Sequence, residues 1–228
     1  MKKFLSILLA MLMLLSGIAF AETADNIVYV SISDDTGALV LAYAPVPLTD
    51  ADADGALTIC DALVAAHVAC HADGAAAFAA VNSEWGLSMA KLWGVENGGS
   101  YGYMLNDASP MSLLDEVKPG DHVKAYAYTD LTAWSDTYSY FTAPVAAVAV
   151  NAEVALSLSS NGYDANWAPV TLPVAGAVIT VNGEKTEVAT DESGNAVLTF
   201  AEAGVYTLSA VSESMTLVPP VCIVTVTE

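Results

Sequence analysis

The hydrophobic pattern of this 228-residue chain changes near residue 145, and the change limits the folds open to it. Between residues 26 and 143, alternating segments typical of strands are interrupted by one clear helical pattern. From residue 150 to 228, short alternating segments follow one another between turn residues, with no helical pattern. We therefore expect an α+β domain over residues 22–145 and an all-β domain over residues 146–228.

The first domain is expected to open with a hairpin, because residues 27–33 and 38–43 alternate around the turn sequence Asp34-Asp35-Thr36-Gly37. A helix is predicted over residues 59–71, which lack Gly and Pro and are rich in Ala and Leu. Residues 75–81 predict a short, weak helix. Further strands are expected at residues 87–93, from Tyr101, and at residues 122–128 and 138–142. A hairpin, a helix and then more strands is the order of a β-grasp-like domain.

The second domain shows only strand and turn signals. Asn182-Gly183 and the stretch from Asp191 to Gly194 have turn chemistry. Strands are predicted at residues 154–159, 177–181, 186–189, 196–200, 204–211 and 221–226. This spacing favours a small β-sandwich.

Residues 50–61, DADADGALTICD, match the twelve-residue loop that binds calcium. Asp50, Asp52 and Asp54 fall at loop positions 1, 3 and 5, and Gly55 falls at position 6, where the chain must turn sharply. Asp61 closes the loop at position 12, where an EF-hand has a longer Glu. The spacing predicts a Ca²⁺ site; the alternative is a solvated acidic turn, since Asp and Gly are ordinary turn residues.

Two more residues complete the predicted ligand set. Ala56 would offer its backbone carbonyl at position 7, and Thr58 would act at position 9, directly or through water. Pro45 and Pro47 exclude a helix before the loop, whereas Thr58 and Asp61 after it resemble a capping box. A loop followed but not preceded by a helix resembles a dockerin more than an EF-hand. Dockerins carry two such loops and this sequence has one, so no cohesin partner is expected.

The first domain resembles the transcobalamin C-terminal-like domain family of bacterial surface proteins in three stretches: ALTICDALVAAH, YGYMLNDASP and LLDEVKPGDHVKAYAYTD. The resemblance implies a β-grasp-like fold but does not imply cobalamin contact, and Tyr101 or Tyr103 stands where Trp is usual. The second domain resembles bacterial immunoglobulin-like surface modules in the stretches GAVITVNG, TDESG and AGVYT. That resemblance implies an immunoglobulin-like sandwich, most simply a spacer, with a binding role as the alternative.

The first 21 residues have the pattern of a secretory signal peptide. Lys2 and Lys3 precede an apolar run, and Ala19-Phe20-Ala21 offers a cleavage site between small residues. The apolar run is short for a membrane span, and no cysteine near the cleavage site could carry a lipid. We expect a secreted, extracellular chain that does not span the membrane after cleavage, either soluble or held at the cell surface by a partner.

The charge of the chain excludes several kinds of partner. The mature chain would keep four lysines and no arginine against 26 acidic residues, a formal charge of −22. Nucleic acid binding needs a basic face, which this composition cannot build. Cys60 and Cys70 lie ten residues apart on the predicted helix and cannot bridge while it is intact, so no obligatory disulfide is expected with Cys222 far away.

Two other groups of side chains suggest sites. His67 and His71 are four residues apart and could hold a transition metal with His122, but the sequence places no third ligand, so packing roles are the favoured interpretation. The pairs Tyr126 with Tyr128, and Tyr138 with Tyr140, each lie on one face of a strand. They could form an aromatic platform for sugars or planar ligands, or they could be ordinary cross-strand pairs.

No arrangement of residues indicates catalysis. No serine lies in a nucleophile-elbow pattern, and nothing selects two carboxylates from the 26 acidic residues as an acid/base pair. The sequence therefore favours a non-enzymatic binding or adhesion protein with a structural Ca²⁺ site and an extracellular protein, glycan or small ligand as partner. The alternatives are capture of a planar ligand such as a corrinoid and, less favoured, a secreted hydrolase.

Overall fold

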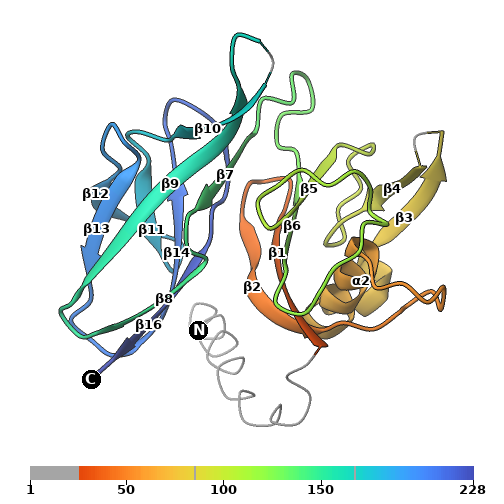
Figure 1. Ribbon diagram of the computed structural model, residues 1–228, viewed down its shortest axis with the longest axis horizontal. Helices are drawn as coiled ribbons and strands as arrows, with labels where there is room; N and C mark the ends of the chain where they lie inside the picture. The colour runs from red at the N-terminus through yellow and green to blue at the C-terminus, as the bar shows by residue number, and fades with distance from the viewer. Residues whose placement is uncertain (1–25, 85, 167) are drawn as a thin grey trace, which may run out of the picture.

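The computed structural model describes residues 26–84, 86–166 and 168–228, so the predicted signal peptide lies outside the described residues. The described chain forms two units of β-structure placed side by side, and a single α-helix belongs to the first (Figure 1). Among the described residues no helix is long and apolar enough to cross a membrane.

The first unit is built on a mixed four-stranded sheet in the order β2-β1-β6-β5. Its strands are β1 (Ile27–Ser33), β2 (Leu39–Pro47), β5 (Tyr101–Leu105) and β6 (His122–Ala127). The predicted hairpin is present as the antiparallel pair β1 and β2. Strand β6 runs parallel to β1 and antiparallel to β5, so the two central strands of the sheet are parallel.

Helix α2 (Ile59–Cys70) packs on one face of this sheet. One side of the helix is apolar and buried: Ile59, Ala62, Leu63 and Ala66 are fully buried against Val28, Val30, Ile32 and Val123 of the central strands. Complete burial of a side chain such as Leu63 stabilises the fold by about 1.5–3 kcal/mol. The capping box is also confirmed, with Thr58 as the N-cap of the helix.

The segment after the helix corrects one prediction. The short helix predicted at residues 75–81 is present only as a 3₁₀ helix, η2 (Gly74–Ala77), and the rest of the segment enters strand β3 (Ala79–Ser83). Strand β3 pairs with β4 (Gly86–Lys91) as a separate two-stranded ribbon. The alanine-rich composition favours a helix locally, but pairing with β4 satisfies the backbone of residues 79–83 instead.

The second unit consists of two sheets that enclose one apolar core. One sheet contains β10 (Pro169–Pro173), β9 (Glu153–Tyr163), β7 (Thr137–Phe141), β15 (Leu217–Val218) and β13 (Asn195–Thr199), which pairs with β9. The other contains β12 (Glu184–Ala189), β11 (Val178–Val181), β14 (Gly204–Val211), β16 (Cys222–Thr227) and β8 (Val145–Ala149). Leu158, Ile179, Leu208 and Val224 are fully buried between them, as expected for a β-sandwich.

Strand β7 differs from its predicted place. It was expected among the strands of the first unit, yet it pairs with β9 and β15 of the second. The alternating aromatics of residues 137–141 identify a strand but do not select its partner. The domain boundary at residue 145 remains a prediction.

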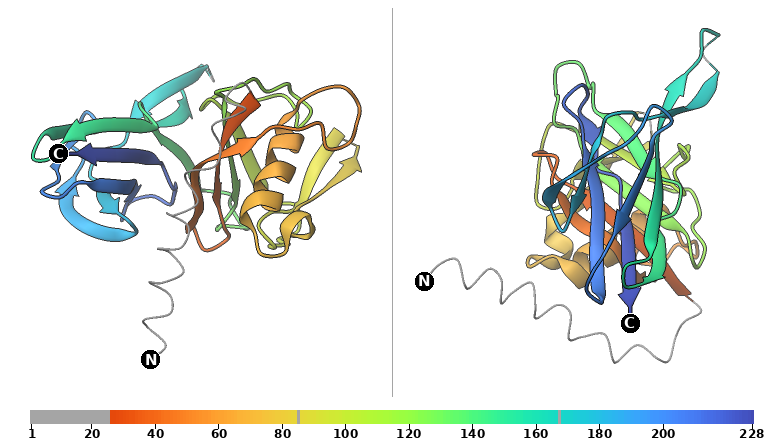
Figure 2. Two further views of the ribbon diagram at one scale, coloured as in Figure 1. Left: turned by 90° about the horizontal axis from the view of Figure 1, so that it is seen from below. Right: turned by 90° about the vertical axis from the view of Figure 1, so that its left-hand side faces the viewer.

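The two faces of the first sheet have different neighbours. Val30 and Ala125 point toward α2, whereas Ser31 and Lys124, on the opposite face, point toward the second unit. Figures 1 and 2 show the sheet between the helix and the second unit. This position explains why every residue of β6 is buried although the strand contains His122 and Lys124.

Candidate functional site

The acidic loop precedes α2 and brings three predicted ligands together. Carboxylate oxygens of Asp50, Asp52 and Asp54 all lie within 4.8 Å of one another. Asp52 and Asp54 are exposed, and Asp50 is half-buried. No ion pair in the described part of the chain involves any of the three. Three negative groups therefore lie close together without a neighbouring cation to offset their repulsion.

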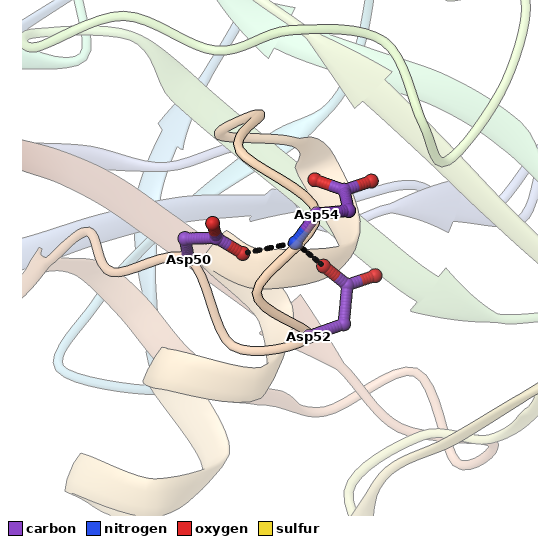
Figure 3. Close-up of side chains that lie close together, drawn as sticks. All are labelled: Asp50, Asp52 and Asp54. Carbon is purple, nitrogen blue, oxygen red and sulfur yellow. Dashed lines mark hydrogen bonds between the residues drawn. The ribbon is translucent and has the colours of Figure 1, made fainter.

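Backbone amides shape this loop. The amide of Asp54 donates to Oδ1 of Asp50 and of Asp52 at 3.2 and 3.3 Å (Figure 3), and the amide of Gly55 donates to Oδ2 of Asp50 at 2.9 Å. Gly55 has φ of +91°, the left-handed conformation that the sharp turn requires. The Gly55 amide is the main reason why the pKa of Asp50 is lowered. The pKa of Asp52 is raised by loss of hydration and by the charge of Asp54.

Asp61 and Thr58 lie at the start of the helix and not in the aspartate cluster. Oδ2 of Asp61 accepts from the amide and hydroxyl of Thr58 at 2.9 and 2.7 Å, and Oδ1 accepts from the amide of Ala51 at 2.8 Å. Both side chains are buried. A carboxylate can accept about four hydrogen bonds, so Asp61 keeps capacity for about one more ligand.

The donors of the loop suit a hard cation. Asp50, Asp52 and Asp54 supply only carboxylate oxygens, which Ca²⁺ prefers over nitrogen or sulfur. Ala56, the predicted carbonyl ligand, lies in the same loop, where its amide donates to Oδ1 of Asp54 at 2.8 Å. The three aspartates are therefore suitable ligands for Ca²⁺. Asp61, by contrast, acts mainly as a cap of the helix.

His67, one of the predicted histidine pair, has a structural role in this fold. Nδ1 of His67 donates to the carbonyl of Leu63 at 2.6 Å, and Nε2 accepts from the amide of Trp93 at 3.0 Å. Both ring nitrogens are therefore used, and burial lowers the pKa of His67, so the neutral ring is favoured. His122 lies on another strand, where Nε2 bonds to the Ser31 hydroxyl at 2.8 Å.

The predicted aromatic platform is part of the junction between the two units. Tyr126 and Tyr138 are only 4% and 5% exposed and form an apolar cluster with Val218, against which Tyr128 and Tyr140 pack half-buried. The ring centroids of Tyr126 and Tyr138 are 6.1 Å apart. Tyr126 and Tyr138 therefore offer almost no surface to a ligand, and only the half-buried Tyr128 and Tyr140 remain partly accessible.

A buried lysine completes this junction, and the sequence analysis missed it. Nζ of Lys124 donates to the carbonyl of Ser139 at 2.9 Å and lies 4.6 Å from the centroid of the Tyr138 ring. Burial lowers the pKa of Lys124 to about 8, and the charge of Asp107 opposes this fall. The one available signal was a lysine in the middle of an otherwise apolar strand, which is a costly place for a charge.

Asp107 joins the units from a tight turn after β5. Asn106 and Asp107 have φ of 50° and 62°, and Leu105 and Ala108 exchange two backbone hydrogen bonds across them. The hydroxyl of Tyr138 donates to Oδ1 of Asp107 at 2.6 Å, and Nδ2 of Asn161 donates to its backbone carbonyl at 3.1 Å. This turn is thereby held by two strands of the second unit.

The fold defines a two-unit protein dominated by β-structure. No family model matches the chain, and no curated protein matches it. The transcobalamin-like resemblance therefore remains a prediction.

Solved structures similar to the chain are immunoglobulin-domain proteins. The first two Ig domains of the Drosophila receptor protein tyrosine phosphatase DLAR give a TM-score of 0.28 at 14% identity, over 67% of this chain and 76% of that one. The N-terminal four Ig domains of Dscam1 isoform 4.44 give 0.27 at 7% identity, over 49% of this chain and 25% of that one. The ectodomain of the teleost fish polymeric Ig receptor gives a TM-score of 0.23 at 8% identity, over 58% of this chain and 64% of that one.

These TM-scores are too low to decide the fold or any function. The chain spans a quarter of the length of the Dscam1 structure that it matches. The β-sandwich of the second unit is established by its own strand pairings and core.

Proposed function

We propose that this chain is a secreted, non-enzymatic binding or adhesion protein in which Ca²⁺ clamps the loop at residues 50–61 to the start of α2. The first unit would be a β-grasp-like module and the second an immunoglobulin-like module. The observation that carries the proposal is the convergence of the Asp50, Asp52 and Asp54 carboxylates within 4.8 Å. Divalent cations relieve such repulsion by binding all the oxygens at once.

The proposed role of the ion is structural. The loop connects the end of β2, an edge strand, with the N-terminus of α2. An ion held by the loop would fix the path between these two elements. If the affinity is in the extracellular range of about 10⁻⁴ to 10⁻³ M, a tenfold excess of Ca²⁺ would add about 1.4 kcal/mol to the free energy of unfolding.

Thermal unfolding in EDTA, in Mg²⁺ and in Ca²⁺ tests the proposal. We expect Ca²⁺ to raise the midpoint by about 3–5 °C for a chain of this size. The double substitution Asp52→Asn with Asp54→Asn should abolish that rise, since it leaves the turn acceptors but removes two charges.

Asp164→Asn is the matched control. Asp164 is an exposed turn residue whose Oδ1 accepts from the amides of Asn166 and Ala168 at 2.8 and 2.9 Å, without neighbouring aspartates. This control should keep the full response to Ca²⁺. A midpoint in the parent protein that is the same in EDTA and Ca²⁺ would refute the calcium site. A response that survives the double substitution would place the ion elsewhere.

A further inference from the structure

A cleft of about 830 Å³ lies between the two units, alongside β2 of the first and β14 of the second. A smaller cleft of about 420 Å³ adjoins it and shares Gly37, Ala210, Val211 and Pro219 with it. Figure 1 shows β2 as the strand of the first sheet nearest to the second unit. The cleft is separate from the acidic loop and from the tyrosine cluster.

The two walls of the cleft present different parts of a sheet. From β2 and its hairpin turn, the consecutive residues 37–40 line the cleft, followed by Ala42. Successive side chains of a strand point to opposite faces, so a run of consecutive residues can meet one cleft only along the edge of the strand. From β14, Val205, Thr207, Ser209 and Val211 line it at alternate positions, together with the buried Ala210, so most of this wall is the outer face of a sheet.

The edge of β2 that lines the cleft is free to pair. Strand β2 ends the order β2-β1-β6-β5, and its ladder partner is β1 alone. Within the described residues, no backbone hydrogen bond joins residues 39–42 to any segment other than β1. An edge strand of this kind exposes a row of N–H and C=O groups that can accept another strand.

The cleft differs from the rest of the surface in charge. Of the described residues that line the larger cleft none is charged, although the chain has a formal charge of −20. Val205 and Val211 are 53% and 37% exposed, so its sheet wall offers apolar contact. Carboxylates lie beside the end that the two clefts share: Glu213 lines the adjoining cleft, and Asp35 is in the hairpin turn before Gly37.

We propose that the cleft binds an extended segment of a partner protein, which adds as a strand to the free edge of β2 and lies over the outer face of β14. The segment would be uncharged where it meets the lining, and basic at the one flank that lies beside Asp35 and Glu213. Residues 37–42 would pair with about six residues of the partner, a length of about 20 Å. This inference deepens the proposed binding function and rests on it.

Selection from a displayed library of linear heptapeptides against the full mature chain in Ca²⁺ tests the inference. Enriched peptides are synthesised, and their affinity is measured by fluorescence anisotropy for the parent protein and two variants. Val205→Arg fills the cleft with a long charged side chain. Val197→Arg is the matched control, because Val197 is 49% exposed on β13, in the other sheet. Both side chains point to solvent, so neither change disturbs the core.

We expect Val205→Arg to weaken binding at least about tenfold and Val197→Arg to leave it within about twofold, since only the first residue lines the cleft. Methylating alternate backbone nitrogens of the peptide should also weaken binding about tenfold or more, because it removes the donors of the added strand. On binding, hydrogen exchange should slow in residues 39–42.

Three results would overturn the inference: no enriched peptide, equal affinity for Val205→Arg and the parent, or full affinity of the methylated peptide. The melting response to Ca²⁺ is measured on the same samples. A preserved response with any of these results would refute the strand-binding cleft and leave the calcium-clamped module standing.

Discussion

Replacement of Lys124 by methionine tests how the junction between the two units holds a buried charge. Methionine keeps an unbranched apolar side chain of similar length and removes the ammonium group. In the folded protein Lys124 is 3% exposed and its pKa is lowered to about 8, mainly by burial. In an unfolded chain the pKa of a lysine is about 10.4. The two states therefore bind different numbers of protons at alkaline pH.

The sign of the effect follows from that difference. Between about pH 8 and pH 10.4 the unfolded state binds more protons at Lys124, so the free energy of unfolding rises with pH. At 1.36 kcal/mol for each pKa unit, the whole rise is about 3 kcal/mol. Most of this rise falls between pH 7 and pH 10, and the remainder lies above pH 10 because the transition is gradual. Below about pH 8 Lys124 is charged in both states, so the full cost of burying its ammonium group lowers the free energy of unfolding.

The variant lacks this titration. It also loses the hydrogen bond to Ser139 and the contact with the Tyr138 ring. This loss changes the free energy of unfolding by nearly the same amount at every pH. We therefore expect the stability of the parent relative to Lys124→Met to rise by about 2–3 kcal/mol from pH 7 to pH 10. Urea unfolding curves at fixed Ca²⁺ and ionic strength measure this difference directly.

Other groups that titrate at alkaline pH are common to both proteins. Burial raises the pKa of the Cys60 and Cys222 thiols to about 11, so both lower the stability of the fold as pH rises. These contributions cancel in the comparison. Lys185→Met removes the same charge from an exposed residue of β12 and controls for net charge. A stability difference for Lys124→Met that stays constant with pH, or that Lys185→Met reproduces, would refute the reasoning.

Two further predictions concern the junction and the second unit. Tyr138→Phe removes the 2.6 Å hydrogen bond to Asp107 and should lower the free energy of unfolding by about 1–3 kcal/mol in urea; an unchanged value would contradict it. Gly194→Ala would place a Cβ atom 2.4 Å from the carbonyl oxygen of Leu158 at φ of +79°, and should cost more than about 2 kcal/mol. Gly183→Ala, at φ of +87° in open space, should cost only about 1 kcal/mol, and equal losses would rule out the steric explanation.

Strands with regular alternation were predicted well from the sequence. The predicted bounds 27–33 and 204–211 coincide with β1 and β14, because each segment alternates and ends in turn residues. By contrast β10 (Pro169–Pro173) was missed, since prolines at both of its ends argue against a strand. It lies at the end of its sheet order, where a missing amide donor is tolerated.

The local part of the candidate site was also predictable. The spacing of Asp50, Asp52 and Asp54 sets their convergence, and the spacing of Thr58 and Asp61 sets the capping box. Each depends on residues fewer than five positions apart, so the backbone of one turn determines the geometry. What spacing did not reveal is that the cap occupies most of the Asp61 carboxylate.

The junction could not be predicted in the same way. The hydrogen-bonded pairs of the junction are far apart in the sequence. The separations are 15 positions for Lys124 and Ser139, 31 for Tyr138 and Asp107, and 54 for Asn161 and Asp107. Such contacts depend on which strand pairs with which, and the aromatic alternation of β7 favours several partners equally. The burial of all six residues of β6 likewise depends on contact with the second unit, which no local pattern in this strand indicates.

The junction and the cleft are connected by their position in the fold. The edge of β2 and the face of β14 belong to different units, so their separation is fixed only by the contacts that hold the units together. Those contacts include the bonds of Lys124 to Ser139 and of Tyr138 to Asp107, all at the same sheet whose edge lines the cleft. A loosened junction would widen the cleft and separate an added strand from the outer face of β14. Hydrogen bonding to the β2 edge would survive this change, whereas apolar contact with Val205 and Val211 would be lost.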